Sequence, residues 1–278
     1  MFFAKALDYY VLHQGFGLFI LNFMTQLNYK EYGSGEPIVI LHGLLGMLDN
    51  WHALSKKLAE DYWVISIDQR NHGKSFHSDQ FSYRLLADDL NQFLMSKHIP
   101  SAHLLGHSMG GKTVMQFLND YSDMANKAII VDISPKEYEG GHEKIFESLL
   151  AIDLTKVQSR KEVENELMAK LDNLGTVLFL MKNLKRKPEG GFEWKANISK
   201  LYASYDNIKG SVELDFVIDN PTLFIKGNNS NYITEEDQKN IKTLFDDVQF
   251  LDIDDAGHWV HADQPEILLK GVKDFLKA

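Results

Sequence analysis

The segment Ala102–Gly111, which reads AHLLGHSMGG, decides the fold expected for this chain. Its apolar first half predicts a buried strand, and the following residues, KTVMQFL at Lys112–Leu118, predict a packed helix. Gly106 and Gly110 flank Ser108 with one residue on either side, which gives the pattern G-x-S-x-G. Because glycine lacks a Cβ, this pattern permits a sharp reversal from strand to helix. The Ser108 hydroxyl is then expected at an exposed helix N-terminus.

Other apolar runs predict the remaining strands of a mostly parallel sheet. Continuous apolar runs are typical of strands that are covered by helices on both faces. Helix-spaced segments lie between several of these runs, so the pattern predicts an α/β fold with helices on both faces of the sheet. The predicted strands are an edge strand at Thr25–Tyr32 and the runs Pro37–Leu41, Tyr62–Asp68, Ala128–Ile133, Thr222–Lys226 and Val248–Ile253.

Residues 139–215 interrupt the alternation of strands and helices. Helix-spaced apolar stripes recur there without an intervening strand, and a polar turn at Lys185–Gly191 divides them. We interpret this block as a helical cap inserted into a core made of residues 25–138 and 216–278. Aromatic residues are the candidates for a substrate pocket, with packing inside the cap as the alternative for the cap residues. These candidates are Phe179, Trp194, Tyr202 and Trp259.

Residues 1–24 do not fit the pattern of the rest. They are aromatic and apolar, but polar residues and glycines interrupt them, and no small-residue cleavage site follows. A spanning helix needs about 20 mostly apolar residues, so we expect a leader outside the working fold and no stable membrane insertion. Met24 directly precedes the first strand pattern and is an alternative start.

Composition narrows the function classes. A chain of 278 residues with 44% hydrophobic content fits one sizeable domain with an insertion. A formal net charge of −10 argues against nucleic acid as a partner, because such binding needs clustered basic residues. The chain has no cysteine, which excludes disulfides and thiolate catalysis and leaves the cytoplasm as the default location. The sequence contains no spacing typical of metal ligands, so we expect neither a metal nor a cofactor. We expect the protein to be a monomer or a homodimer.

His258 is the candidate general base for Ser108. It follows Gly257 in a loop between the last strand and the last helix, and it comes after the serine in chain order. A neutral imidazole can accept the Ser108 proton and return it to a leaving alcohol. Asp132 lies near the end of a predicted strand, at the edge where parallel sheets collect catalytic groups. The N–H of Met109, at the start of the helix, can stabilise a developing oxyanion.

Together these motifs resemble the α/β-hydrolase superfamily, and in particular small bacterial serine esterases of the abhydrolase type. The resemblance covers nearly all of residues 25–278. Its motifs identify the fold and the chemistry strongly and the substrate weakly. They are His42-Gly43-Leu44, GHSMGG at Gly106–Gly111, DISP at Asp132–Pro135, and Gly257-His258.

The resemblance implies further roles. In the superfamily the residue after His-Gly, here Leu44, supplies a second oxyanion donor. The orienting acid usually follows the strand placed at Thr222–Lys226, but the matching residue here is Ser230. Some members keep the acid at the position of Asp132, so we assign it as the third catalytic residue and Ser230 as a helper at the His258 imidazole. The implied substrates are small or short-to-medium acyl esters, with acyl thioesters as an additional class.

Related activities define the alternatives. Haloalkane dehalogenases and epoxide hydrolases share this architecture but use a carboxylate nucleophile, which Ser108 excludes. Hydrolases of carbon–carbon bonds, perhydrolases and lyases also use a serine and a histidine, so these activities remain alternatives. The alternative that is not an enzyme is a homologue that binds a ligand without catalysing a reaction.

Overall fold

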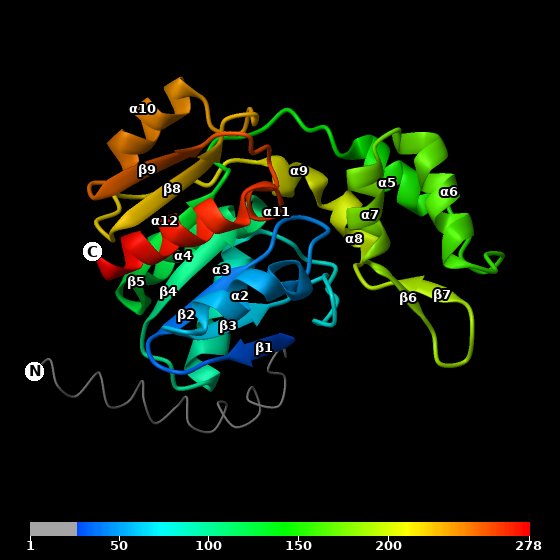
Figure 1. Ribbon diagram of the computed structural model, residues 1–278, viewed down its shortest axis with the longest axis horizontal. Coiled ribbons are helices and arrows are strands. Elements are labelled where there is room, and N and C mark those ends of the chain that lie inside the picture. Colours follow the sequence, from blue (N-terminus) through cyan, green and yellow to red (C-terminus); the bar gives the residue numbers. More distant parts are fainter. Residues whose placement is uncertain (1–26) are drawn as a thin grey trace, which may run out of the picture.

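The computed structural model describes residues 27–278, and the predicted leader at 1–24 lies outside them. A seven-stranded sheet forms the centre, with the order β1-β3-β2-β4-β5-β8-β9 (Figure 1). Only β1 pairs antiparallel, and every other neighbouring pair is parallel, so the predicted mostly parallel sheet is confirmed. The strands are β1 (Tyr29–Tyr32), β2 (Pro37–Leu41), β3 (Trp63–Ile67), β4 (Ala102–His107), β5 (Ala125–Val131), β8 (Thr222–Gly227) and β9 (Val248–Ile253).

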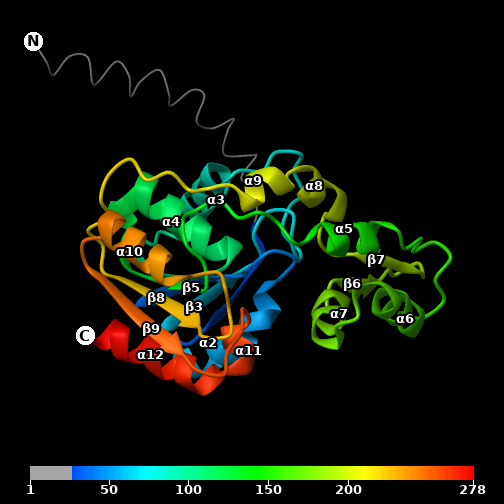
Figure 2. The same cartoon turned by 90° about the horizontal axis from the view of Figure 1, so that it is seen from above.

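Helices cover both faces of this sheet, as predicted. The side chains of a strand alternate between its two faces, so Val39 of β2 joins one apolar cluster and Ile40 joins the other. The first cluster includes residues of α3, α4 and α10, and the second includes residues of α2 and α12 (Figure 2). The helices are α2 (His52–Leu58), α3 (Tyr83–Ser96), α4 (Met109–Tyr121), α10 (Glu235–Leu244), α11 (Val260–Asp263) and α12 (Pro265–Lys277).

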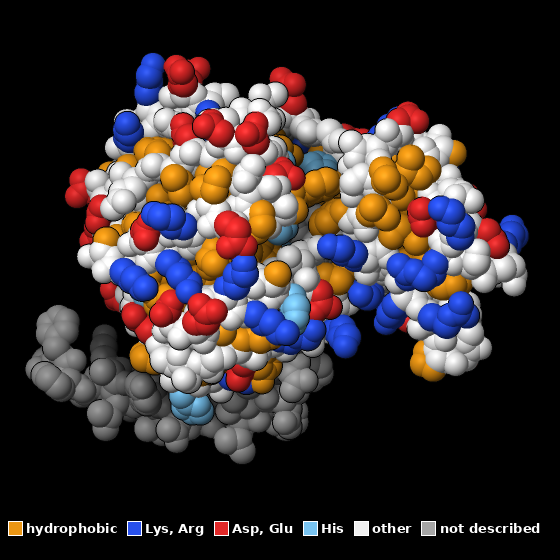
Figure 3. All heavy atoms as spheres, viewed as in Figure 1, with side chains coloured by type: hydrophobic (Ala, Val, Ile, Leu, Met, Phe, Trp, Pro, Cys, Tyr) orange, Lys and Arg blue, Asp and Glu red, His pale blue; other side chains and the backbone are white. Residues whose placement is uncertain are grey.

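The segment between β5 and β8 forms a lobe beside the sheet (Figure 1). Figure 3 shows hydrophobic side chains gathered on this lobe and along its boundary with the main body. Its elements are α5 (Glu143–Leu150), α6 (Arg160–Leu171), α7 (Leu174–Met181), β6 (Leu184–Arg186), β7 (Phe192–Trp194), α8 (Ile198–Ala203) and α9 (Tyr205–Lys209).

The expectation that the lobe contains helices alone was wrong. The polar stretch at 185–191 contains the end of β6 and the loop of a hairpin, in which β6 and β7 pair antiparallel. Gly190 and Gly191 have φ angles of +100° and +78°, which a right-handed helix does not contain. The Lys187 N–H donates to Gly191 O at 3.1 Å and closes the loop. A turn that helix spacing alone would place between two helices therefore connects two short strands.

Both chain segments that lead into and out of the lobe meet one buried amine. The Lys112 side chain, from α4, is 1% exposed. Its Nζ donates to Lys136 O at 2.7 Å on the entering segment and to Lys209 O at 3.2 Å on the leaving one, and also to Gly210 O. Burial lowers the pKa of this amine to about 7, and its three hydrogen bonds match the three N–H donors of the protonated form. These hydrogen bonds attach the base of the lobe to α4, which begins directly after Ser108.

Candidate active site

Ser108 lies at the turn between β4 and α4, as the G-x-S-x-G pattern predicts. Its φ and ψ are 53° and −119°, an unusual conformation for a residue with a side chain. A Cβ on Gly106 would lie 2.2 Å from Gly110 O, and one on Gly110 would lie 2.4 Å from Leu41 O. No other residue type fits these two positions without moving the backbone. The turn therefore holds the Ser108 hydroxyl at the N-terminus of α4.

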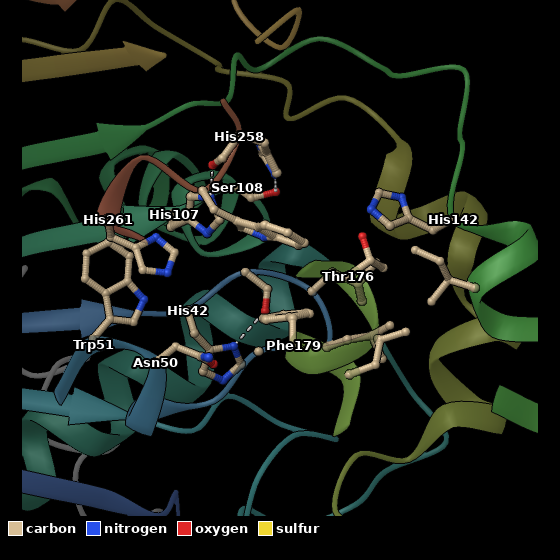
Figure 4. Close-up of a pocket in the computed structure, with 17 residues that line it drawn as sticks. His42, Asn50, Trp51, His107, Ser108, His142, Thr176, Phe179, His258 and His261 are labelled. Atoms are coloured by element: carbon tan, nitrogen blue, oxygen red, sulfur yellow. Dashed lines mark hydrogen bonds between the residues drawn. The ribbon is translucent and has the colours of Figure 1, made fainter. Parts of the chain in front are cut away.

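Three loops at the carboxyl edge of the sheet bring Ser108, His258 and Asp132 together. His258 Nε2 lies 3.0 Å from Ser108 Oγ (Figure 4), and His258 Nδ1 lies 2.8 Å from Asp132 Oδ2. These loops follow β4, β9 and β5, which are not consecutive in the chain. An imidazole between a hydroxyl and a carboxylate is the arrangement that lets serine lose its proton during attack.

Asp132 follows β5 and is fully buried. The Gly227 N–H donates to its Oδ1 at 3.2 Å, and the Ser230 hydroxyl donates to its Oδ2. The structure therefore differs from the expectation for Ser230, because its hydroxyl contacts the carboxylate rather than the His258 imidazole. The physical reason is strand order: β8 pairs directly with β5, so the turn after β8 lies beside Asp132. Hydrogen bonds of this kind stabilise a buried carboxylate in its charged form.

Two contacts that sequence reasoning missed hold His258 in place. The Tyr232 ring stacks on the imidazole, with centroids 3.8 Å apart and an interplanar angle of 15°. His107 Nε2 lies 2.8 Å from the backbone carbonyl of His258, which can only accept, so His107 donates. Burial lowers the pKa of His107 well below its ordinary value, and the ring is neutral. The position of His107 directly before Ser108 was the available signal for this contact.

The loop that carries Leu44 is held by two buried histidines. His42 donates from Nδ1 to Gly43 O at 2.8 Å, and its Nε2 accepts from a backbone N–H at 3.0 Å. His72 Nε2 accepts from the Leu45 N–H at 3.1 Å. Burial lowers the pKa of His42 to about 4 and that of His72 to about 3, so both rings are neutral at pH 7. His42 and His72 therefore fix the turn that follows β2.

Two cavities meet at Ser108. The larger has a volume of about 190 Å³ and the smaller about 40 Å³, and Leu44 and His142 also border both. In Figure 4 Trp51 and His261 lie at one side of the larger cavity, and His142 lies at the other. Met109, the first residue of α4, borders the smaller cavity, and its N–H has no acceptor within the helix. Leu44 and Met109, the residues predicted to supply the oxyanion donors, thus border the same cavity as Ser108.

Only part of the predicted substrate pocket faces these cavities. Phe179 and Trp259 border the larger one, with ring centroids 5.2 Å apart. The predictions for Trp194 and Tyr202 were wrong, because neither residue borders either cavity. Trp194 packs against the apolar cluster from the hairpin, and Tyr202 stacks on Phe146 inside the lobe. Both residues serve the packing of the lobe.

Within residues 27–278, no group of three or more His, Asp or Glu side chains is arranged to hold a metal ion. In the same part of the chain, no helix combines the length and the apolar character needed to cross a membrane.

Comparison with known proteins places this site in a family. The family model described as alpha/beta hydrolase fold matches residues 36–265. The esterase YbfF of Escherichia coli is 34% identical over 257 residues, which cover 92% of this chain and 98% of the relative. An sn-1-specific diacylglycerol lipase of Danio rerio is 33% identical over 255 residues, 88% of this chain and 80% of the relative. A solved marine microorganism esterase is 40% identical, with a TM-score of 0.88, and covers 90% of this chain and 99% of its own. The chain, with its Ser108 turn on a mostly parallel sheet, belongs to the α/β-hydrolase-fold family.

Proposed function

We propose that this protein is a serine hydrolase of carboxylic esters that acts through an acyl-enzyme. The observation that carries the proposal is the hydrogen-bonded series Ser108, His258 and Asp132 at the junction of two cavities. The relatives named esterase and lipase support the same class of reaction. Small or short-to-medium acyl esters are the proposed substrates, with acyl thioesters as a side activity.

The first half of the reaction transfers the acyl group to Ser108. As Ser108 Oγ bonds to the ester carbon, its proton passes to His258 Nε2. The carbonyl oxygen becomes negative and is stabilised by the N–H groups of Leu44 and Met109. The buried Asp132 carboxylate stabilises the imidazolium that forms. When the tetrahedral intermediate collapses, the bond to the alcohol breaks and His258 gives its proton to the leaving oxygen.

The second half releases the acid. A water molecule gives its proton to His258 Nε2 and bonds to the acyl carbon, and the same two N–H groups stabilise the second oxyanion. Collapse returns the proton to Ser108 Oγ and frees the carboxylic acid. Asp132 holds the imidazole with its proton on Nδ1, so that Nε2 is an acceptor at the start of each half. This route requires no metal and no cofactor.

The lobe is proposed to act as a cap for this site. His142 and Phe179 belong to the segment between β5 and β8, and both border the larger cavity. A cap of this kind excludes bulk water and surrounds the part of the substrate that does not react. We propose a cytoplasmic monomer or homodimer that acts on small molecules.

The test combines covalent labelling with turnover. The folded protein should react with a fluorophosphonate probe and hydrolyse p-nitrophenyl esters, with acyl-CoA thioesters measured beside them. Ser108→Ala should lose labelling and reduce kcat by about 10⁶-fold, which is the scale for loss of a nucleophile. Ser101→Ala, at a serine outside the site, is the matched control and should keep both activities. A folded wild-type protein that neither binds the probe nor hydrolyses any ester would instead be a ligand-binding homologue.

A further inference from the structure

The two cavities differ in which parts of the catalytic machinery they border. His258 borders the larger cavity and is absent from the lining of the smaller one. Met109, which carries an oxyanion donor, borders the smaller cavity and is absent from the lining of the larger one. Ser108 and Leu44 border both. An ester bound at Ser108 therefore extends one of its two groups into each cavity.

Proton return decides which group enters which cavity. The leaving oxygen must receive a proton from His258 Nε2, so the alcohol has to lie on the side of His258. That side opens into the larger cavity, where Trp259 and Phe179 also lie. The acyl group has no proton to receive and extends away from His258, past the Met109 N–H. It therefore enters the smaller cavity.

The two cavities also differ in size. The smaller has a volume of about 40 Å³ and the larger about 190 Å³, so the smaller is about a fifth as large. The acyl group is therefore expected to be the shorter of the two parts of the ester, and the alcohol the larger.

The smaller cavity also has an apolar character. Its walls include the rings of Tyr83, Tyr138 and Tyr205, the side chains of Ile133 and Ile208, and the Lys112 side chain, whose amine is bonded to three backbone carbonyls. The tyrosine hydroxyls are engaged elsewhere: Tyr83 donates to Ile208 O at 2.5 Å, and Tyr138 donates to a backbone carbonyl at 2.7 Å. Tyr205 accepts from a backbone N–H at 3.1 Å. An acyl group without polar substituents suits such walls.

From these observations we infer that the protein cleaves esters that join a short, unsubstituted acyl group to a large alcohol. The inference rests on the proposed function and deepens it, because it assigns the acyl group to the smaller cavity and the alcohol to the larger one. Two series of esters test it in the wild-type protein. The first series varies the acyl group of p-nitrophenyl esters from acetyl to octanoyl. The second series keeps the acetyl group and varies the alcohol from ethanol to octanol.

The two series should respond in opposite ways. One methylene group too many for a hydrophobic pocket costs about tenfold or more. We expect kcat/KM to fall at least tenfold between butanoyl and octanoyl esters, and to stay level or rise from ethyl to octyl acetate. A preference for octanoyl over acetyl esters, or a tenfold loss from ethyl to octyl acetate, would overturn the assignment.

A pair of isoleucine variants adds a test inside the lobe. Ile208 borders only the smaller of the two cavities, and Ile145 borders only the larger. Ile208→Ala should raise the ratio of hexanoyl to acetyl ester activity about tenfold, because it lengthens the acyl cavity. Ile145→Ala removes the same atoms and should leave that ratio unchanged. The assignment is wrong if Ile145→Ala alone changes the ratio, and Ile208→Val replaces Ile208→Ala if the latter does not fold.

Failure of this inference is distinguishable from failure of the proposed function. If the acyl and alcohol preferences are reversed while the fluorophosphonate probe still labels Ser108, the protein is an ester hydrolase and the cavity assignment is overturned. If no ester in either series is hydrolysed and no probe binds, the proposed function itself fails and the assignment falls with it.

Discussion

Replacing Asp132 by asparagine tests how the buried carboxylate acts on His258. Asp132 Oδ1 accepts the Gly227 N–H, and Oδ2 lies 2.8 Å from His258 Nδ1. In the variant, the amide oxygen can keep the contact with Gly227, which leaves the amide NH₂ facing the imidazole. An NH₂ group can only donate, so Nδ1 must accept and the ring proton moves to Nε2. Nε2 can then no longer take the proton of Ser108, and we expect kcat to fall about 10⁴-fold.

Ser230→Ala is the variant with which the loss of kcat in Asp132→Asn is compared. This change removes one hydrogen bond from the charged Asp132 carboxylate but leaves the charge and the imidazole tautomer intact. Such a bond contributes about 1.5–3 kcal/mol, so kcat should fall by about 10- to 100-fold at most. The two variants should therefore differ by at least about 100-fold.

The assay is steady-state hydrolysis of p-nitrophenyl acetate at pH 7.5, with the rate of fluorophosphonate labelling as a second readout. Thermal unfolding of each variant checks that the fold is intact. If Asp132→Asn keeps more than a tenth of the wild-type kcat, or if Ser230→Ala is the more damaging change, Asp132 does not set the tautomer of His258.

Two further predictions concern the stability of the protein at low pH and the steric effect of an added Cβ. His42 and His72 are neutral in the folded protein with pKa values near 4 and 3, while the unfolded chain takes up protons below about pH 6.5. The free energy of unfolding should therefore fall as the pH drops from 6.5 to 4, by roughly 3 kcal/mol for each ring, and urea unfolding at pH 7, 6, 5 and 4 measures it; a flat profile contradicts this. Gly106→Ala places a Cβ 2.2 Å from a backbone oxygen and should lower the unfolding free energy by more than about 3 kcal/mol. Gly175→Ala, whose Cβ meets nothing closer than 3.4 Å, should stay within about 1 kcal/mol of wild type, and equal effects of the two glycine changes would refute the steric argument.

Features that depend on local sequence were predictable. The turn at Ser108 needs glycine at two nearby positions, and a pentapeptide carries that requirement. The inner strands β2, β3, β4 and β8 are buried along nearly their whole length, so they appeared as largely apolar runs. The position of Asp132 followed from the same logic, because a residue at the end of such a strand lies at the edge where the other loops converge.

Features that depend on contacts across the chain were not predictable. The stacking of Tyr232 on His258 and the bond from Ser230 to Asp132 arise from the pairing of β8 with β5, which no local pattern records. The hairpin in the lobe has strands of three residues, too short to show an alternation of apolar and polar side chains. Trp194 was assigned to the pocket because aromatic residues line many pockets, but aromatic residues pack cores equally well.

The buried Lys112 amine limits how the lobe can move. One buried amine joins the entering and the leaving segment of the lobe to α4, so separating either segment from α4 would leave N–H groups of Lys112 without an acceptor. A buried N–H group without an acceptor is costly, which favours a base of the lobe that stays at a constant distance from Ser108. The smaller cavity, which Lys112 and Lys209 border, is therefore fixed on that side by the same hydrogen bonds.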